Sequence, residues 1–361
     1  MPEQPPPWET VGVVDQQPHP AEPAETPERA ARSRRRRRRR TVLLTLLIVF
    51  VVLVGGASLG GWLYLRSVET SISRVDAFSQ IPQQSRPQKV VTDAENMLIL
   101  GSDSRDPEST AGSRTDTIIL AHLPKDRASA QLVSIPRDTL VHIPRSPDGK
   151  HGSVNDKINA AYAWGGVPLV VETVEAFTGV RIDHVVLVDF GGFKEIIDAL
   201  GGVDIYVDQS FTSQYGFNGP RTFKKGLQHM DGAAALDYSH ERHAFADGDF
   251  ARIRHQQQMI KAVLDKAASA GLLTNPARLN SFLRATAKAV SVDQTMSIVD
   301  TAMQLRQLRS GNLTFFTSPS SGTGMVAGQS MVFANTAKAK TLYDAIRRDN
   351  VPQILSSASA G

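Results

Sequence analysis

A run of 25 residues without a charged side chain, Thr41 to Leu65, constrains this chain more than any other feature of its sequence. A helix rises about 1.5 Å per residue, so this run is long enough to cross the roughly 30 Å hydrocarbon core of a bilayer. The apolar region of a cleaved signal peptide is shorter, about 7 to 15 residues. The run therefore predicts one uncleaved transmembrane signal-anchor helix.

The residues before this run set the predicted orientation. Residues 1–31 are rich in Pro, Glu, Gln and Ala, which predicts disorder, and eight arginines follow within residues 32–40. Arginines beside an apolar segment hold that flank in the cytoplasm. We therefore expect a single-pass protein of the cell membrane, with a cytoplasmic tail over residues 1–40, the anchor at 41–65, and an extracytoplasmic domain after it.

The charge balance argues against nucleic-acid binding. Residues 1–65 hold nine arginines and six acidic residues, which leaves 31 basic and 30 acidic residues in the rest of the chain. A nucleic-acid-binding domain carries its basic surplus in its folded part, so we expect no nucleic-acid partner. The chain also has no cysteine, which excludes disulfides, thiolate metal sites and cysteine nucleophiles.

Beyond the anchor, apolar residues at helical spacing and then a break around Pro82 predict a stalk over residues 66–91. From residue 92 to 356, short apolar runs alternate with helical patterns, and residues 357–361 are expected to form a flexible C-terminus. This alternation predicts one α/β domain with a central mixed β-sheet flanked by helices on both faces. The expected strands are 96–101, 115–123, 131–139, 184–190 and 203–207, with a late strand pair at 312–318 and 331–335; the expected helices are 157–164, 167–177, 193–200, 232–242, 250–270, 276–290, 295–309 and 337–349.

Charged residues cluster at the ends of three expected strands. Asp103 and Arg105 follow the first strand, Arg114 and Asp116 begin the second, and Arg137 follows the third. If these strands are antiparallel neighbours, all of these side chains meet at one end of the sheet. Two carboxylates without His or Cys partners suit a hard cation such as Mg²⁺, and the planar fork of arginine suits phosphate.

A second charged segment, residues 238–258, adds Arg242, Asp249, Arg252, Arg254 and Gln256. Arg252 and Gln256 are four residues apart and share one helix face, whereas Arg254 lies about 200° around the helix from Arg252 and is expected in solvent. The two segments together predict a clamp for a pyrophosphate. Neither contains a P-loop, a Gly-x-Ser-x-Gly elbow or a His-Glu-x-x-His motif, which argues against nucleotide hydrolysis, serine hydrolysis and zinc proteolysis.

In the order GSDSR, SRTDT, SIPRDT, KINAAYAWGG, DFGGF, IDALGGVDI and GDFARIRHQQQ, these motifs resemble the LytR-CpsA-Psr family of bacterial membrane-anchored glycopolymer transferases. The resemblance covers roughly residues 96–267. It implies an α/β fold that holds a polyprenyl-pyrophosphate lipid, and the apolar helix faces of the domain either form the core or line a cavity for the lipid chain. It also implies that the phosphate-linked glycopolymer of that lipid passes to a hydroxyl of peptidoglycan.

The resemblance also implies roles for single residues. Carried over by position, Asp103 and Asp116 would bind Mg²⁺, and His240 and His255 stand where the family commonly has basic residues. A partly charged His240 would weaken the clamp at neutral pH. The implied catalytic residues are Arg137, Arg242 and Arg252, and the implied substrate-binding residues are Arg105, Arg114, Gln256 and His240.

Three further candidates have two interpretations each. Lys157 and Asn159 open an expected helix and act either as polar capping residues or as substrate contacts. Asp189 ends an expected strand and either contacts the acceptor sugar or caps the following turn of two glycines.

Two other functions stay open. A phosphatase would use the same groups with water as the acceptor. A regulator of transcription is disfavoured, because the tail of about 40 residues carries no helix-turn-helix.

Overall fold

The structure is a computed structural model that describes residues 64, 66–102, 115–214, 219–269, 271 and 274–351. The predicted cytoplasmic tail, nearly all of the predicted anchor and the C-terminal tail lie outside these residues. So do Asp103, Arg105 and Arg114. In the part of the chain that the structure describes, no helix is long and apolar enough to cross a membrane.

A seven-stranded mixed sheet forms the centre of the fold, with the order β1-β12-β7-β2-β3-β4-β13. Its middle strands are almost continuously apolar and buried, as expected for strands covered on both faces. The bounds are β1 Ser73–Val75, β2 Glu95–Ser102, β3 Thr115–Leu123, β4 Ala130–Ser134, β7 His184–Asp189, β12 Val290–Asp293 and β13 Leu313–Thr317.

The strand pairing confirms the expected meander. β2 pairs antiparallel with β3, and β3 pairs antiparallel with β4, so the C-terminal ends of β2 and β4 and the N-terminal end of β3 share one end of the sheet. β7 runs parallel to β2, which brings Asp189 opposite Ser102 at that same end.

The expected late strand pair is wrong. β13 joins the main sheet parallel to β4, and β15 (Gln329–Ala334) pairs instead with β14 (Ser320–Val326) in a separate hairpin. A short apolar strand carries no local signal for its partner, because the two pairings are compatible with the same alternation.

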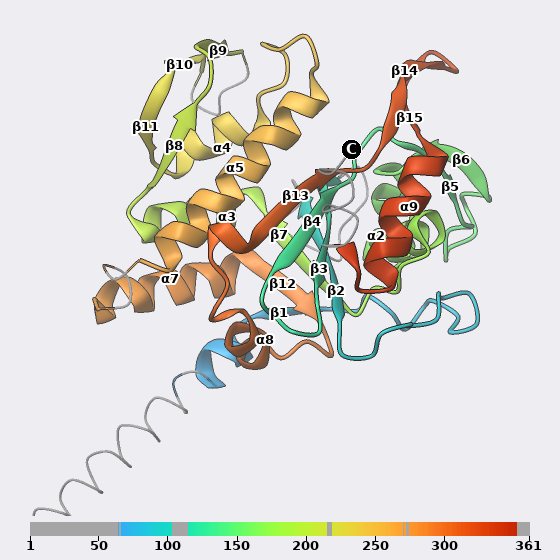
Figure 1. Ribbon diagram of the computed structural model, residues 1–361, viewed down its shortest axis with the longest axis horizontal. Helices are drawn as coiled ribbons and strands as arrows, with labels where there is room; N and C mark the ends of the chain where they lie inside the picture. The colour runs from blue at the N-terminus through green and yellow to red at the C-terminus, as the bar shows by residue number, and fades with distance from the viewer. Residues whose placement is uncertain are drawn as a thin grey trace, which may run out of the picture. The chain divides into compact units, whose positions relative to one another are not determined.

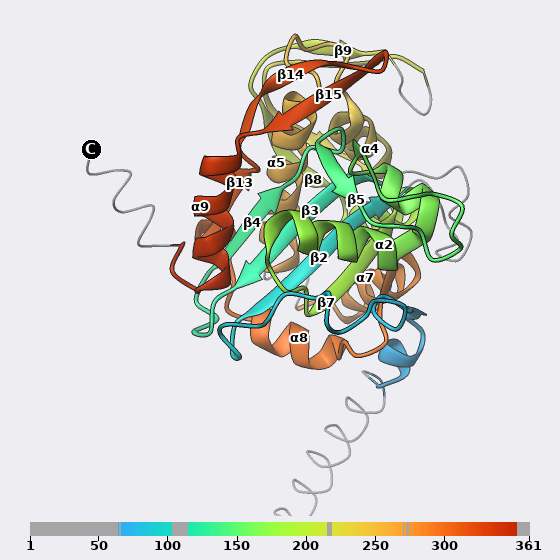
Figure 2. The same cartoon turned by 90° about the vertical axis from the view of Figure 1, so that its right-hand side faces the viewer.

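Helices cover both faces of the sheet, as predicted (Figure 1). On one face, α2 and α9 pack onto a core that contains Leu98, Leu120 and Val133; Figure 2 looks onto this face. On the other face, the core around Met97, Ile119 and Leu132 includes residues of α5, α7 and α8. The helices are α2 Ala160–Thr178, α3 Phe190–Leu200, α4 Gly232–His240, α5 Asp249–Ala267, α7 Pro276–Ala289, α8 Ile298–Leu305 and α9 Thr336–Arg347.

Four short strands pack beside α4 and α5. They form two antiparallel ribbons, β8 (Val203–Val207) with β11 (Gly226–Met230) and β9 (Phe211–Ser213) with β10 (Arg221–Phe223). Their apolar side chains share a third core with Tyr238 of α4 and Met259 of α5. This core holds α5 through Met259, which follows directly after the second charged segment.

The predicted start of the first helix is wrong. Lys157 ends β6 (Val154–Lys157), which pairs with β5 (Leu140–Ile143), and the helix begins only at Ala160. The break expected between the helices at 157–164 and 167–177 is confirmed, because the helical stretch α2 has non-helical backbone at Gly165 and Gly166.

The segment predicted as a stalk is part of the folded unit. β1 adds to the sheet beside β12, and Ile72, Ala77 and Ile81 are buried. Farther along, the Arg86 guanidinium contacts both carboxylate oxygens of Glu175 in α2 at 2.7 to 3.2 Å, with side chains only 4% and 2% exposed. An apolar pattern this short predicts a helix or a buried strand edge equally well, and the packing decides between them.

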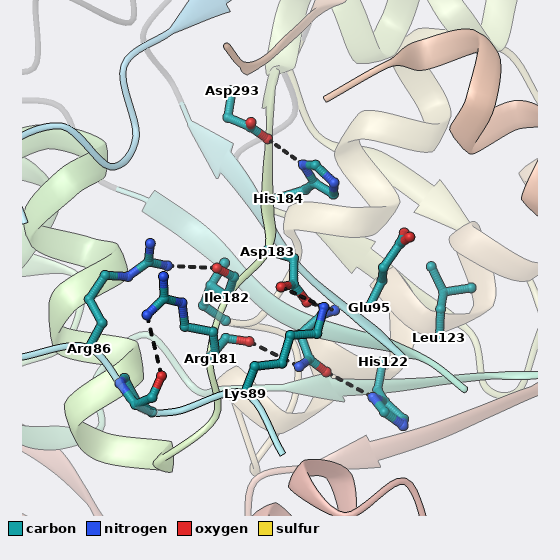
Figure 3. A network of polar contacts seen from close by, with 12 residues as sticks. Arg86, Lys89, Glu95, His122, Leu123, Arg181, Ile182, Asp183, His184 and Asp293 are labelled. Atoms are coloured by element: carbon teal, nitrogen blue, oxygen red, sulfur yellow. Dashed lines mark hydrogen bonds and ion pairs between the residues drawn. The ribbon is translucent and has the colours of Figure 1, made fainter. Parts of the chain in front are cut away.

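Polar contacts fasten this segment to the end of the sheet opposite Asp189 (Figure 3). The Lys89 ammonium lies 2.9 Å from an oxygen of Asp183, whose other oxygen accepts from the backbone N–H of Asn96 at 2.9 Å. Next to them, His184 contacts the buried Asp293 at 3.1 Å. Burial opposes the charged form of Asp293, but hydrogen bonds from His184, Thr295 and backbone N–H groups outweigh it and lower its pKa to about 2.

Candidate functional site

Charged side chains meet at the sheet end where β2, β4 and β7 finish and β3 begins. Arg137 follows β4 after a Pro136 turn, and Asp116 is the second residue of β3. The antiparallel register of β3 and β4 brings their side chains into contact, so an NH₂ group of Arg137 donates to Asp116. This confirms the predicted meeting of these two residues. The predicted Asp103, Arg105 and Arg114 lie outside the described residues.

Arg137 is the centre of the cluster. Besides its contact with Asp116, its Nε lies 3.8 Å from oxygens of both Asp138 and Asp249, and its side chain is only 14% exposed. Asp138 in turn lies 3.0 Å from the Lys157 ammonium. Positive and negative side chains thus alternate across a partly buried surface, in the order Lys157, Asp138, Arg137 and Asp249.

Lys157 reaches the cluster from strand β6, and Asn159 contributes through its backbone. The N–H of Asn159 donates to the carbonyl of Arg137 at 3.2 Å, and the preceding Ile158 donates to Thr139 at 2.9 Å. The Asn159 side chain is buried and makes no capping bond at the start of α2. Of the two interpretations, capping is therefore wrong for Lys157, which lies in β6, and Asn159 stands at the N-cap of α2 without a side-chain cap bond. Both residues hold the segment after β4 in place.

The first turn of α5 supplies the second half of the cluster. Arg252 donates to Asp249 one turn earlier, and the Arg252 side chain is 3% exposed. One turn later, Gln256 donates to the hydroxyl of Thr117 in β3 at 2.9 Å. By contrast, Arg254 is 55% exposed and pairs with Asp247 at 2.5 Å, which confirms its predicted place outside the site.

Opposite charges favour the ionised forms of Asp116 and Arg137 despite their burial. Burial alone would raise the pKa of Asp116, but Arg137 and Arg252 outweigh it, and the pKa lies below the usual range. Burial likewise opposes the charge on Arg137, yet the three carboxylates around it raise its pKa. For Arg252, burial together with the nearby Arg137 and Arg242 outweighs the effect of the carboxylates, and the pKa of Arg252 is lowered. Arg252 is thus a buried guanidinium whose positive charge is opposed by burial and by two neighbouring arginines.

Arg242 lies on the loop after α4, where its Nε contacts His243 at 3.3 Å. The positive charge of Arg242 is close enough to Arg252 to contribute to the lowering of the Arg252 pKa. No direct contact between Arg242 and the described carboxylates of the cluster is present. The structure thus places Arg242 at the edge of the site.

The two histidines that stand at basic family positions differ from the expectation. Burial lowers the pKa of His240, whose Nδ1 lies 2.9 Å from the Leu236 carbonyl and whose ring contacts Phe190 edge-on. Burial lowers the pKa of His255 to about 4, and its ring stacks on Tyr238 within an aromatic cluster. Both side chains are therefore neutral at pH 7, and His255 belongs to the core.

Asp189 caps a helix. Its carboxylate accepts from the backbone N–H of Gly192 at 2.7 Å, which makes it the N-cap of α3. The capping interpretation is confirmed. Asp189 also borders the cavity described next, so the cap does not remove it from the site.

Two adjoining cavities lie between the sheet and α5. The site cavity, of about 140 Å³, is bordered by Gly101, Thr117, Asp189, His240 and Gln256. A Cβ on Gly101 would lie 2.9 Å from the Thr117 side chain, so only glycine keeps the wall here open. The inner cavity, of about 390 Å³, has an entirely apolar lining. The two cavities share the lining residues Ile99, Val188, Phe193, Met259 and Ile260.

The positions of the lining residues along β3 and α5 show how the inner cavity is oriented. It follows β3 from Ala121 to Leu123 and α5 from Met259 to Ala267, so it runs away from the charged cluster toward the opposite end of the sheet. This arrangement suits a ligand with an anionic head and a long apolar tail. Within the described residues, no group of three or more His, Asp or Glu side chains is placed to hold a metal ion.

Asp138 and Asp249 are the functional-site residues that the sequence patterns did not assign. Both adjoin a predicted arginine in sequence, so only the spatial contact with Arg137 distinguishes them from ordinary surface carboxylates. The signal that points to Asp249 is its spacing of three residues from Arg252 on one helix.

Comparison with known proteins gives concordant matches. The profile of the LytR_cpsA_psr family matches residues 64–348. The teichoic acid transferase TagU of Bacillus cereus, named as a polyisoprenyl-teichoic acid–peptidoglycan transferase, is 36% identical over 231 residues, which cover 62% of this chain and 71% of TagU. The corresponding transferase TagV of Bacillus subtilis is 31% identical over 285 residues, 78% of this chain and 68% of TagV.

The solved structures agree in fold. The crystal structure of Bacillus subtilis TagV superposes with a TM-score of 0.59 at 27% identity and covers 71% of this chain and 97% of TagV. TagT bound to LIIa-WTA superposes with a TM-score of 0.59 at 24% identity and covers 76% of this chain and 99% of TagT.

Proposed function

This chain belongs to the LytR_cpsA_psr family, and on that basis we propose that it transfers a glycopolymer phosphate from a polyprenyl-pyrophosphate lipid to a hydroxyl of peptidoglycan. The observation that carries the proposal is the continuity of a charged cluster with an apolar cavity along one face of the sheet. We further propose that the predicted anchor at 41–65 holds the enzyme at the outer face of the cell membrane.

The charged cluster suits the pyrophosphate head. Arg137, Arg252 and Lys157 face Asp116, Asp138 and Asp249, so the described cluster is balanced while no anion is bound. A pyrophosphate would draw the guanidinium groups from their carboxylates, and Arg252, whose pKa is lowered by burial and by its cationic neighbours, gains most from such a partner. A guanidinium binds two phosphate oxygens at once.

The inner cavity suits the polyprenyl tail. Its walls are Ile, Leu, Val, Met, Phe and Ala side chains from the sheet, α3, α5 and α8, and it adjoins the site cavity through five shared residues. Burying an apolar chain there is favourable by about 25 cal/mol per Å² of surface removed from water. The tail would therefore provide binding energy at a distance from the reacting phosphorus.

We propose that Mg²⁺ binds at the phosphate end of the site. Asp116 supports this proposal, because its pKa is lowered and its side chain is 21% exposed. The predicted second ligand, Asp103, lies outside the described residues. Carboxylate oxygens are the donors that Mg²⁺ prefers. When bound, Mg²⁺ would neutralise charge on the phosphate oxygens. We propose that Asp103 and Asp116 bind this Mg²⁺.

The proposed reaction breaks one P–O bond and forms another. The acceptor hydroxyl oxygen attacks the phosphorus that carries the glycopolymer and loses its proton, while the bond from that phosphorus to the bridging oxygen breaks. The products are a phosphodiester on peptidoglycan and polyprenyl phosphate. Negative charge grows on the leaving phosphate, and Arg137 and Arg252 stabilise it more strongly in the transition state than in the ground state.

An assay with labelled lipid-linked glycopolymer and peptidoglycan tests this function. We expect label on peptidoglycan, and we expect EDTA to abolish transfer and added Mg²⁺ to restore it. The variant Asp116→Ala should lose both activity and its response to Mg²⁺. If the wild-type protein releases only free glycopolymer, the protein is a phosphatase and the transferase proposal is wrong.

A further inference from the structure

We propose that α8 and the segment entering the fold at residue 64 form a surface that rests on the lipid bilayer, so that the inner cavity opens toward the membrane. This inference rests on the proposed function, because it assigns the route by which the lipid substrate enters. It commits to one partner, the surface of the membrane that anchors this chain.

The far end of the inner cavity lies beside α8. The cavity lining there consists of Leu123 at the end of β3, Ala130 at the start of β4, and Leu305 of α8 with the following Leu308. These positions are at the opposite ends of their strands from Asp116 and Arg137. The charged cluster and α8 therefore lie at the two ends of one apolar passage.

The chain also enters the fold beside α8 (Figures 1 and 2). The Glu69 carboxylate accepts from the backbone N–H of Ile298, the first residue of α8, at 3.2 Å. Val68 and Ile72 pack in the same core as Leu305 and Leu308. The predicted anchor ends at residue 65, only four residues before Glu69 in sequence, which favours the end of the fold beside α8 as the one nearest the membrane.

The outer side of α8 exposes one large apolar side chain, Met303, beside the exposed Asp300 and Ala302. Met303 is 54% exposed, although methionine is an apolar residue, and Arg306 donates to its backbone carbonyl at 2.6 Å. An apolar side chain beside a long cationic one is typical of helices that lie in the interface, where the cation reaches the head groups. The other strongly exposed methionine, Met325 at 68%, lies on the β14–β15 hairpin, away from α8 in both views (Figures 1 and 2).

Membrane contact at α8 would give the tail a continuous apolar path. A polyprenyl chain could pass from the bilayer between α8 and α5 into the inner cavity without crossing water, and its pyrophosphate would reach the cluster around Arg137. The phosphate end would then face away from the membrane, toward the cell wall.

The absence of cysteine makes a direct test simple. Met303→Cys, Met325→Cys and Ser67→Cys are introduced singly into the full-length chain and labelled with a polarity-sensitive fluorophore. Each protein is reconstituted into vesicles of phosphatidylglycerol and phosphatidylcholine, with or without bromine on the acyl chains. Ser67 lies two residues after the predicted anchor and reports that the anchor is inserted, and Met325 is the matched exposed control.

We expect brominated lipids to quench the labels at positions 303 and 67 at least about twofold, and the label at 325 by less than about a tenth, since an interfacial helix lies roughly 5 to 10 Å into the head-group boundary. Quenching at 67 without quenching at 303 would overturn the proposal, and so would equal quenching at 303 and 325. Absence of quenching at position 67 would also overturn the proposal, because it would show that the predicted anchor is not inserted in the bilayer. The readout needs no turnover, so failure of the proposed transfer reaction would not alter it.

Discussion

Two arginines of α5 offer a matched test of the site. Arg252 and Arg254 are two residues apart on one helix, and each forms an ion pair with an aspartate, but their side chains are 3% and 55% exposed. Arg252 lies within the cluster of Arg137 and Asp116, whereas Arg254 pairs with Asp247 at the surface. Alanine at each position removes the same charge from the same helix, so only the location differs.

We expect Arg252→Ala to lower turnover at least about a hundredfold, which corresponds to about 2.7 kcal/mol of transition-state stabilisation from one preorganised donor. Arg254→Ala should change turnover less than about twofold, because an exposed ion pair contributes roughly 0 to 1 kcal/mol. Arg252→Lys should recover little activity, since an ammonium is a point charge that cannot bind two oxygens in parallel.

The assay is transfer of labelled lipid-linked glycopolymer to peptidoglycan at saturating substrate, with free glycopolymer counted separately. Thermal unfolding of each variant distinguishes lost catalysis from lost folding, since Arg252 is buried beside Asp249. A folded Arg252→Ala variant with turnover close to that of Arg254→Ala would refute the assignment of Arg252 to the phosphate.

Three further predictions concern the cavity and the opposite end of the sheet. Ala121 borders the inner cavity and is 6% exposed, so Ala121→Phe should lower transfer from a full-length polyprenyl substrate but spare a short-chain analogue; equal loss with both would argue against a tail site. Replacing either partner of the buried Arg86–Glu175 pair by alanine should reduce the free energy of unfolding by about 3 to 5 kcal/mol, measured by urea denaturation, because an unpaired charge stays buried. The pKa of Asp293 is lowered in the folded protein from 3.8 to about 2, so its contribution of about 2 kcal/mol is complete above pH 4 and lost as the pH falls toward 2. The difference in urea midpoint between the wild-type protein and Asp293→Asn should therefore shrink over that interval, and a difference independent of pH would contradict it.

Patterns within short stretches of sequence were enough to predict much of this protein. The meander of β2, β3 and β4 follows from three apolar runs joined by polar turns, and it alone predicts that Asp116 and Arg137 meet. The spacing on α5 separates Arg252 and Gln256 from Arg254, because a helix repeats every 3.6 residues. These features depend on the local period of the chain.

Other features were decided by tertiary structure, because they join segments that are far apart in sequence. The partners of β1 and β13 lie more than a hundred residues away, and no local pattern distinguishes an edge strand from a stalk. The division of apolar residues between core and cavity is equally non-local, since Ala121 and Leu308 border an empty space only where α5 and α8 leave one.

The charge states of His240 and His255 also depend on the fold. The sequence shows histidine at positions 240 and 255, and an unperturbed pKa near 6.5 leaves either one partly charged. Burial against Phe190 and Tyr238 lowers both pKa values, because an apolar environment penalises the imidazolium form. The amino-acid sequence by itself predicted that Asp116 and Arg137 meet at one end of the sheet, and the tertiary structure decided that Asp138 and Asp249 join them and that burial lowers the pKa of both histidines.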